Sequence, residues 1–224
     1  MRAPISVVIP TLNAAAELGP CLATLGEGLR AGILRELVIS DGGSTDATRD
    51  IAEAAGALWV EGPPGRGGQL ARGVAATGGA WVLVLHADTE LSDGWPGAVL
   101  AGIETGRPGY FRLRFRARGP GAAWVAGWAN LRARLFGWPF GDQGLLVSRA
   151  DYETAGGYPD IALMEDLALA RALPRTRPLA ATATTGAERY RAHGWLRQGA
   201  ANLWRQARFL AGADPERLAR AYRR

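Results

Sequence analysis

The side chains of this sequence that could do chemistry are mainly carboxylates and arginines that lie beside glycines or directly after apolar runs. They occur in four short segments: Asp41–Asp46, Gly65–Gln69, His86–Thr89 and Met164–Asp166. A carboxylate can accept a proton or a strong hydrogen bond, and an arginine can hold a phosphate through two parallel hydrogen bonds. These residue types therefore favour carboxylate chemistry on a substrate that carries phosphate.

What the sequence lacks narrows the chemistry further. There is one cysteine, Cys21, and the two histidines are His86 and His193, which excludes an internal disulfide, a multi-thiolate zinc site and a histidine-rich metal cluster. All 26 basic residues are arginine, which excludes a Walker A lysine and a Schiff-base mechanism. No serine lies in a G-x-S-x-G motif.

The first half of the chain alternates the elements that must position these segments. Apolar runs predict strands at 5–9, 37–40, 58–60 and 81–85. The stretches after the first three runs, up to about Glu27, at 45–55 and at 69–77, predict helices, with Asp46 as a helix-start residue. This alternation indicates an α/β fold with a mainly parallel sheet covered by helices on both faces.

Polar segments follow each of these predicted strands. They are Pro10–Asn13, Asp41–Asp46, Gly65–Gln69 and His86–Thr89. In open α/β sheets, ligands bind beyond the carboxyl ends of the strands, so we expect these segments to meet at one edge.

The second half is less regular. The sequence predicts a half-exposed strand at 109–118, a short strand at 145–147 and helices at 122–136, 149–155, 163–173, 194–211 and from Pro215. In proteins with a parallel sheet followed by a mixed region, the parallel part usually binds a nucleotide and the mixed part usually binds a second substrate.

The arginines are clustered. Residues 107–134 hold seven arginines and no acidic residue, and residues 189–224 hold nine arginines against Asp214 and Glu216. Such asymmetry indicates a face that meets an anion, and nucleic acid, anionic lipid and a phosphorylated substrate all fit it.

Four motifs, in order, carry a resemblance to a known family: Val8–Asn13, Ser40–Asp46, His86–Asp88 and Met164–Asp166. The chain resembles the family 2 glycosyltransferases of the GT-A fold over nearly its whole length. Within that family it looks closest to a small bacterial subgroup that is often assigned to arsenosugar biosynthesis. The subgroup's H-A-D-T, G-R-G-x-Q, G-D-Q and G-G-[FY]-P motifs read here as 86–89, 65–69, 141–143 and 156–159.

The resemblance implies a single GT-A domain over 1–224. Its nucleotide-sugar-binding half would cover about 1–106, its acceptor and catalytic half about 107–192, and its C-terminal helices about 193–224. The implied enzyme is an inverting glycosyltransferase that uses Mg²⁺ or Mn²⁺ and a nucleotide diphosphate sugar, which family habit suggests is UDP-linked. The acceptor would be a small molecule or a lipid-linked phosphate, and nucleic acid would not be a partner.

The resemblance also assigns roles to residues. The donor's base and ribose would be bound around Pro10, Thr11, Asn13, Asp41 and Gly42, and its diphosphate by Arg66, Gly67, Arg189 and Arg191. Asp88 would ligate the metal, with His86 and His193 as additional candidates, although the usual motif has an acid at the place of His86. Asp166 would be the catalytic base, with Glu165 orienting the acceptor or raising the pKa of Asp166.

Other interpretations of the same residues remain open. Asp41 with its glycines could form an ordinary turn, Asp88 could cap a helix, and Glu165 with Asp166 could be a solvated helix face. A dinucleotide-binding oxidoreductase, a sugar nucleotidyltransferase and a non-catalytic membrane-surface module are rival functions.

The helix at 194–211 carries tryptophans beside arginines, and we expect it to pack on a core, with contact to an anionic membrane as the alternative. With no signal-peptide pattern and no membrane-spanning run in the sequence, we expect a cytoplasmic protein, or one peripheral to the inner face of the membrane.

Overall fold

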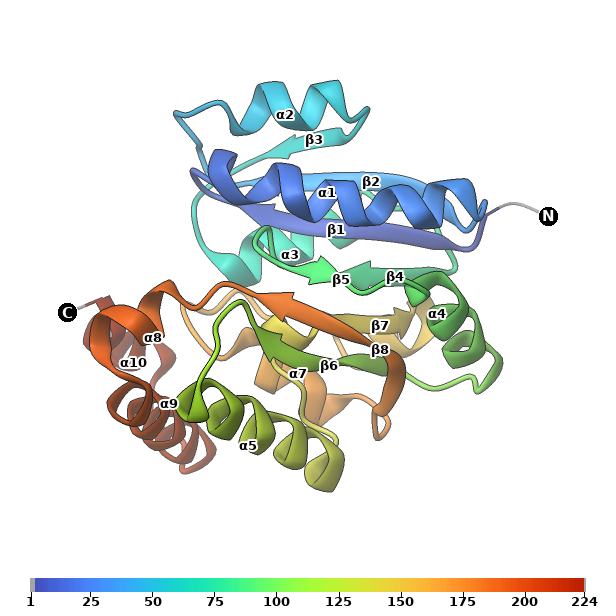
Figure 1. Cartoon of the computed structure of the whole chain (residues 1–224). Helices are drawn as coiled ribbons and strands as arrows, with labels where there is room; N and C mark the ends of the chain where they lie inside the picture. The colour runs from blue at the N-terminus through green and yellow to red at the C-terminus, as the bar shows by residue number, and fades with distance from the viewer. Residues whose placement is uncertain (1–2, 224) are drawn as a thin grey trace.

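An eight-stranded sheet organises the chain, in the order β3-β2-β1-β4-β7-β6-β8-β5 (Figure 1). This computed structural model describes residues 3–223, so residues 1, 2 and 224 of the expected domain lie outside the described part. The strands are β1 (Ile5–Thr11), β2 (Leu34–Asp41), β3 (Leu58–Glu61), β4 (Trp81–Val84), β5 (Glu90–Leu91), β6 (Gly109–Phe115), β7 (Leu145–Ser148) and β8 (Arg177–Thr185).

The sheet has a parallel half and a mixed half, as the sequence predicts. β1 to β4 pair in parallel, β7 runs antiparallel between β4 and β6, β8 runs parallel to β6, and β5 runs antiparallel to β8. The carboxyl ends of β1, β2, β4, β6 and β8 and the start of β7 therefore share one edge of the sheet.

Helices cover both faces of the sheet, which confirms the predicted α/β architecture. On one face, α1 (Ala15–Arg30) and α4 (Trp95–Glu104) pack Leu18, Trp95 and Val99 on the inward side chains of β1. On the other face, α3 (Arg66–Ala75), α6 (Arg149–Thr154) and α7 (Glu165–Ala172) enclose a second apolar cluster that includes Leu70 and Leu169. Burial on both faces explains why the parallel strands are continuous apolar runs.

Asp46 has the structural role that the sequence predicts. Its Oδ1 accepts a hydrogen bond from the N–H of Thr48 at the start of α2 (Thr48–Ala54; 3.0 Å), and its Oδ2 accepts one from Ala15 N–H at the start of α1 (3.1 Å). The carboxylate thereby satisfies N–H groups that two helix starts would otherwise leave unpaired.

Four of the α-helices and strands described here are absent from the sequence-based prediction: α4, β5, β8 and α8 (Glu188–His193). Along β8, Leu179, Ala181, Ala183 and Thr185 point inward in strict alternation. Because three of these four are alanine or threonine, the alternation carries little apolar contrast, and the sequence pattern does not predict a strand there. The strand predicted at 109–118 does form, and it ends at Phe115.

The expectation that the C-terminal amphipathic helix packs its apolar residues on a core holds only in part, because Trp195 packs on a buried apolar cluster while other apolar residues of the helix are exposed. The four elements involved are α5 (Pro120–Phe136), α8 (Glu188–His193), α9 (Trp195–Leu210) and α10 (Pro215–Arg223), which gather at one end of the molecule (Figure 1). On α9 the buried residues are Gln198, Gly199 and Gln206, whereas Leu196 and Trp204 are exposed. Among the described residues, no helix combines the length and the apolar character that crossing a bilayer needs.

A close backbone contact fixes α3 against the loop that precedes α7. A Cβ on Gly67 would overlap the carbonyl oxygen of Pro159, which is a backbone atom and cannot swing away. We expect Gly67→Ala to destabilise the fold by about 2 kcal/mol, because the loop must move to admit the methyl group. Urea unfolding tests this against Gly127→Ala on α5, where no heavy atom lies within 4 Å of the added carbon. The control should be neutral or stabilising, and an equal loss in both variants would contradict the packing role of Gly67.

Candidate active site

The turn after β2 is built around the buried carboxylate of Asp41. Its Oδ1 accepts hydrogen bonds from the hydroxyls of Thr11 (2.8 Å) and Ser44 (2.5 Å), and its Oδ2 accepts from the N–H groups of Gly43 (2.7 Å) and Ser44 (2.6 Å). Burial would raise the pKa of Asp41, but the hydrogen bonds from Ser44, Thr11 and Gly43 outweigh it and lower the pKa. Asp41 is therefore ionised, and all of its acceptor positions are occupied by the protein.

Asn13 joins the loop after β1 to this turn. Its backbone N–H donates to Ser44 Oγ (2.8 Å), and its side-chain Oδ1 accepts from Thr45 N–H (2.8 Å). Its φ of 52° lies in the left-handed region, which is sparsely populated by residues other than glycine. Residues with such strained backbone conformations cluster at ligand-binding sites. The structure thus brings together one predicted set: Pro10, Thr11, Asn13, Asp41 and Gly42.

Asp88 follows β4 and is held by the end of β8. Its Oδ2 accepts hydrogen bonds from Thr185 Oγ1 (2.9 Å) and Gly186 N–H (3.2 Å). In the described part of the chain, no hydrogen bond reaches its Oδ1. Asp88 therefore has a fixed orientation and one carboxylate oxygen that is available to a ligand.

A second carboxylate, which the sequence did not reveal, lies beside Asp88. A Cβ added to Gly186 would overlap Glu188 Oε2 and would lie 3.1 Å from Asp88 Oδ2, so both carboxylates approach the same glycine. Between residues 3 and 223 no three His, Cys, Asp or Glu side chains form a metal cage. Mg²⁺ is commonly held by only one or two carboxylates, with substrate phosphates and water completing its shell. Asp88 and Glu188 therefore fit a divalent ion that arrives with a diphosphate.

Asp166 lies at the start of α7. Its Oδ2 accepts a hydrogen bond from Gly141 N–H (2.7 Å), and its Oδ1 accepts one from Leu167 N–H (2.8 Å). Met164, two residues before Asp166, has a φ of 70°, which is strained for a residue with a side chain. The strained backbone at Met164 and the two N–H donors hold the partly exposed carboxylate of Asp166 in one orientation.

His86 connects the two predicted catalytic regions. Its ring packs on Gly141, where a Cβ would overlap Nε2. Burial and the charge of Arg66 lower the pKa of His86 to about 4, while the charges of Asp88 and Asp166 act in the opposite direction. Because Gly141 N–H donates to Asp166 and the His86 ring packs on the same glycine, Asp166 lies beside the segment His86–Asp88. His86 is neutral at physiological pH.

Glu165 is buried beside Asp166 and pairs with Arg66. Arg66 Nε lies 3.7 Å from Glu165 Oε1. Burial and the neighbouring Asp166 raise the pKa of Glu165 to about 7, although Arg66 opposes the shift. Arg66 and Glu165 thereby join α3 to α7 across the cleft.

We expect Glu165→Gln to remove most of the loss of stability between about pH 5 and pH 8. Because folding raises the pKa of Glu165, its contribution to stability is fully present below the unfolded pKa and is lost as the pH rises through about 7, a difference of about 3 kcal/mol. Urea unfolding at several pH values measures this, with Glu153→Gln on the exposed side of α6 as the control. If Glu165→Gln and the wild type lose stability in parallel, the carboxyl is not protonated in the folded protein.

The predicted residues of α8 lie in different surroundings. Burial and the charge of Arg66 lower the pKa of Arg189, so these two guanidinium groups lie near each other. Arg191 Nη2 donates to the carbonyl of Arg116 (2.7 Å), and His193 Nδ1 contacts the carbonyl of Arg189 within the same helix (3.0 Å). Across residues 3–223, no hydrogen bond or ion pair joins His193 to Asp88 or His86. The structure brings Arg66 and Arg189 together and leaves His193 outside this group.

Asp142 is a further residue of the cleft to which the sequence gave no role. Its Oδ1 is buried and has no hydrogen-bond partner among the described residues. Burial raises its pKa to about 6, with Asp166 and Asp88 adding to the shift and Arg132 opposing it. The signal for it was the G-D-Q motif at 141–143, in which no role was assigned to the aspartate.

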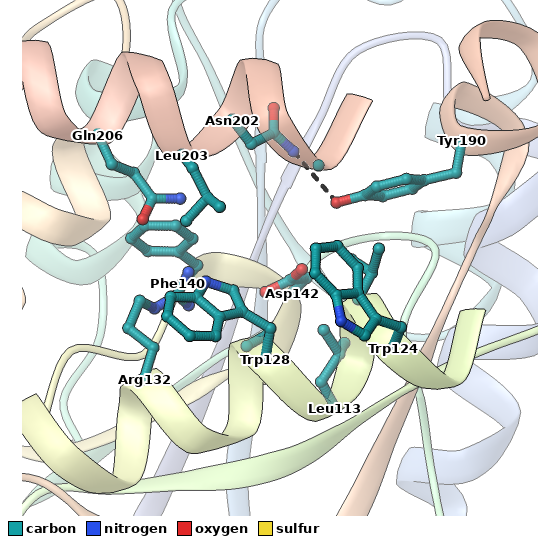
Figure 2. Close-up of a pocket in the computed structure, with 13 residues that line it drawn as sticks. Leu113, Trp124, Trp128, Arg132, Phe140, Asp142, Tyr190, Asn202, Leu203 and Gln206 are labelled. Carbon is teal, nitrogen blue, oxygen red and sulfur yellow. Dashed lines mark hydrogen bonds between the residues drawn. The ribbon is translucent and has the colours of Figure 1, made fainter. Parts of the chain in front are cut away.

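Asp142 lies at the inner end of a cavity of about 60 Å³ between α5 and α9 (Figure 2). Aromatic and apolar side chains form most of the wall, among them Trp124, Trp128 and Leu203. Arg132 stacks on the ring of Phe140 at 3.6 Å from its centroid. The cavity therefore combines an apolar wall with the charged groups of Arg132 and Asp142.

Residues 6–121, just over half of the chain, match the family described as "Glycosyl transferase family 2". A PGL/p-HBAD biosynthesis glycosyltransferase of Mycobacterium tuberculosis is 39% identical over 99 residues, which are 41% of this chain and 38% of that protein. The chain therefore spans well under half the length of this curated relative.

Solved structures share the fold. Staphylococcus aureus TarS in complex with UDP superposes with a TM-score of 0.63 at 18% identity, over 84% of this chain and 62% of that one. Glucosyl-3-phosphoglycerate synthase from Mycobacterium tuberculosis, in complex with Mn²⁺, UDP and phosphoglyceric acid, superposes with a TM-score of 0.50 at 26% identity, over 82% of this chain and 69% of that one.

Proposed function

Because the chain belongs to glycosyl transferase family 2, we propose that it transfers a sugar from a nucleotide diphosphate sugar, with UDP as the nucleotide, to an acceptor hydroxyl or phosphate, with inversion at the anomeric carbon. The observation that carries this proposal is that Asp166 and His86 both contact Gly141, so the Asp166 carboxylate lies beside the segment that carries Asp88. Within the family we assign the chain to the H-A-D-T subgroup. In support, Gly67, His86 and Gly141 of its motifs all pack around this cleft.

The donor is assigned to the parallel half of the sheet, about residues 1–106. Its base and ribose would lie at the Asp41 turn, where a base contact to Asp41 must replace one of four internal hydrogen bonds. Its diphosphate would be bound by Arg66 and Arg189, because guanidinium groups can hold phosphate through two parallel hydrogen bonds. The Mn²⁺ and UDP in glucosyl-3-phosphoglycerate synthase support this donor class.

Asp88 and Glu188 would hold the divalent ion, which supplies charge stabilisation for the leaving diphosphate. His86 is neutral and next to this region, so its imidazole is available as a further ligand. His193 would join them only if α8 moved, because its ring is engaged within α8.

The second half of the chain, about 107–192, would receive the acceptor. Asp166 takes the proton from the acceptor hydroxyl as its oxygen forms the bond to the anomeric carbon, and the bond from that carbon to the diphosphate breaks. A single displacement with one base inverts the anomeric centre. Gly141 N–H and Leu167 N–H would keep Asp166 oriented, and the raised pKa of Glu165 would limit the negative charge beside the base.

A thermal-shift screen of UDP, GDP and NAD, each with and without Mn²⁺, tests the class and the donor. We expect UDP with Mn²⁺ to raise the Tm, because a ligand that binds only the folded state stabilises it by mass action. UDP alone should act weakly, and GDP and NAD should not. Stabilisation by NAD alone would favour an oxidoreductase, and no response to any nucleoside diphosphate would contradict the proposal.

A further inference from the structure

Most of the large apolar side chains that are exposed in residues 3–223 lie on two neighbouring helices, α5 and α9. We call them the apolar face: Trp124, Trp128, Leu131, Leu135, Phe136, Leu196, Trp204 and Leu210. On α5 the first four recur every three or four residues, which is the spacing of one helix side. That side would ordinarily face a core, but α5 buries an adjacent side instead, with Val125 and Ala129.

The two helices are packed against each other, and apolar side chains from both meet at one cavity. Trp124 and Trp128 from α5 and Leu203 from α9 line the same cavity (Figure 2). Since the side chain of Trp124 is 53% exposed and that of Trp128 is 43% exposed, these two residues form the rim of the cavity. A contiguous apolar surface of this kind marks a docking site rather than scattered surface residues.

The charge around the apolar face has one sign. Neither α5 nor α9 contains an acidic residue, and the exposed arginines there include Arg134, Arg197 and Arg208. The guanidinium of Arg208 lies 4.7 Å from the ring centroid of Trp204, so charge and aromatic surface are presented together. Arginine beside tryptophan and leucine is the composition of helices that lie in the headgroup region of a bilayer.

We propose that the apolar face docks this protein on the surface of an anionic membrane, with α5 and α9 lying in the headgroup region. The apolar side chains enter the acyl boundary, and the arginines contact lipid phosphates. A second copy of the chain is a poorer occupant, because a symmetric pair would bring arginine against arginine with no acid on either helix.

Docking in this orientation directs the rim of the cavity toward the lipid. Asp142 lines the cavity together with Trp124 and Trp128, and the residue before it, Gly141, donates its N–H to Asp166 (2.7 Å). Resting on the proposed function, this geometry assigns the acceptor to molecules that the bilayer carries. The docking itself requires no turnover.

Vesicle flotation tests the docking directly. The wild-type protein is expected to float with vesicles of phosphatidylcholine and phosphatidylglycerol, and to remain largely unbound with phosphatidylcholine alone. The variant Leu131→Ser/Leu135→Ser/Trp204→Ser should bind at least about tenfold more weakly, because three membrane-contacting side chains are lost. None of the three lines the cavity and all are exposed, so the fold should be retained, which circular dichroism can verify.

The matched control is Leu29→Ser/Leu58→Ser/Leu100→Ser, which removes three exposed leucines from α1, β3 and α4. It should float like the wild type, as should the inactive Asp166→Asn, which separates docking from catalysis. Equal losses in both triple variants would show that binding is not localised to the apolar face.

Absence of wild-type flotation would overturn the proposal. Light scattering of the same samples would then reveal whether a dimer, abolished by the α5/α9 triple variant, covers the face instead.

Discussion

Replacing Asp166 with Asn is expected to lower kcat for sugar transfer by about a thousandfold, because a positioned general base contributes two to four orders of magnitude. The loss should fall on kcat and leave binding of UDP unchanged, since Asp166 contacts Gly141 and Leu167 rather than the donor's turn. The measurement is steady-state transfer, with UDP affinity measured by calorimetry on the same variant.

The control for this variant is Asp93→Asn, which changes an exposed aspartate outside the cleft. It should retain wild-type kcat. If Asp166→Asn transfers sugar at the wild-type rate, the base is a different residue, and Asp142 is then the next carboxyl to test because its Oδ1 is buried in the same cleft without a partner.

Replacing Asp88 with Asn is expected to abolish the effect of Mn²⁺ on UDP binding. In the wild type, Mn²⁺ should tighten UDP binding by about a hundredfold, because a bridging ion supplies several kcal/mol of charge stabilisation. In the variant, calorimetry should give the same weak affinity with Mn²⁺ and with a chelator.

Thr185→Val provides a graded comparison for Asp88. It removes the hydroxyl that donates to Asp88 Oδ2 and leaves the carboxylate in place. Loss of such an orienting partner typically costs about tenfold or more in metal affinity, so the variant should lie between the wild type and Asp88→Asn. Full Mn²⁺ dependence in Asp88→Asn would mean that Asp88 does not hold the ion.

The parallel half of the sheet was predictable because its strands are buried on both faces. Uninterrupted runs such as Val7–Ile9 and Val82–Leu85 leave little alternative to a strand, and the polar segments after them mark the ligand edge. Asp46 was predictable for a local reason, since its carboxylate caps the helix two residues away.

The elements that depend on long-range context could not be predicted. β8 is identifiable as a strand mainly through its pairing with β6 and β5, because alanines and threonines fill its inward positions. The sequence likewise did not show whether the apolar side of α5 faces the core or the surface. Helical spacing of apolar residues shows that the helix has an apolar side but not what covers that side.

In the site, motifs identified single residues and missed their partners. Glu188 has no motif of its own, and it reaches Asp88 because β8 ends at Thr185 and turns at Gly186. Arg66 and Glu165 are ninety-nine positions apart in the chain, and their contact follows from α3 packing on the loop before α7. Such pairs are set by tertiary packing, which spacing in one sequence does not encode.

The most direct test of the shared cleft is the NMR signal of the Met164 methyl group, with ¹³C-methyl methionine as the label. Met164 immediately precedes Glu165 and Asp166, and Met164→Leu identifies its signal. If Asp88 holds a metal across the same cleft, Mn²⁺ added with UDP should broaden the Met164 signal strongly, whereas Mg²⁺ with UDP, or Mn²⁺ with UDP in Asp88→Asn, should leave it sharp. A Met164 signal that stays sharp while Mn²⁺ and UDP are bound would contradict the joint action of Asp88 and Asp166.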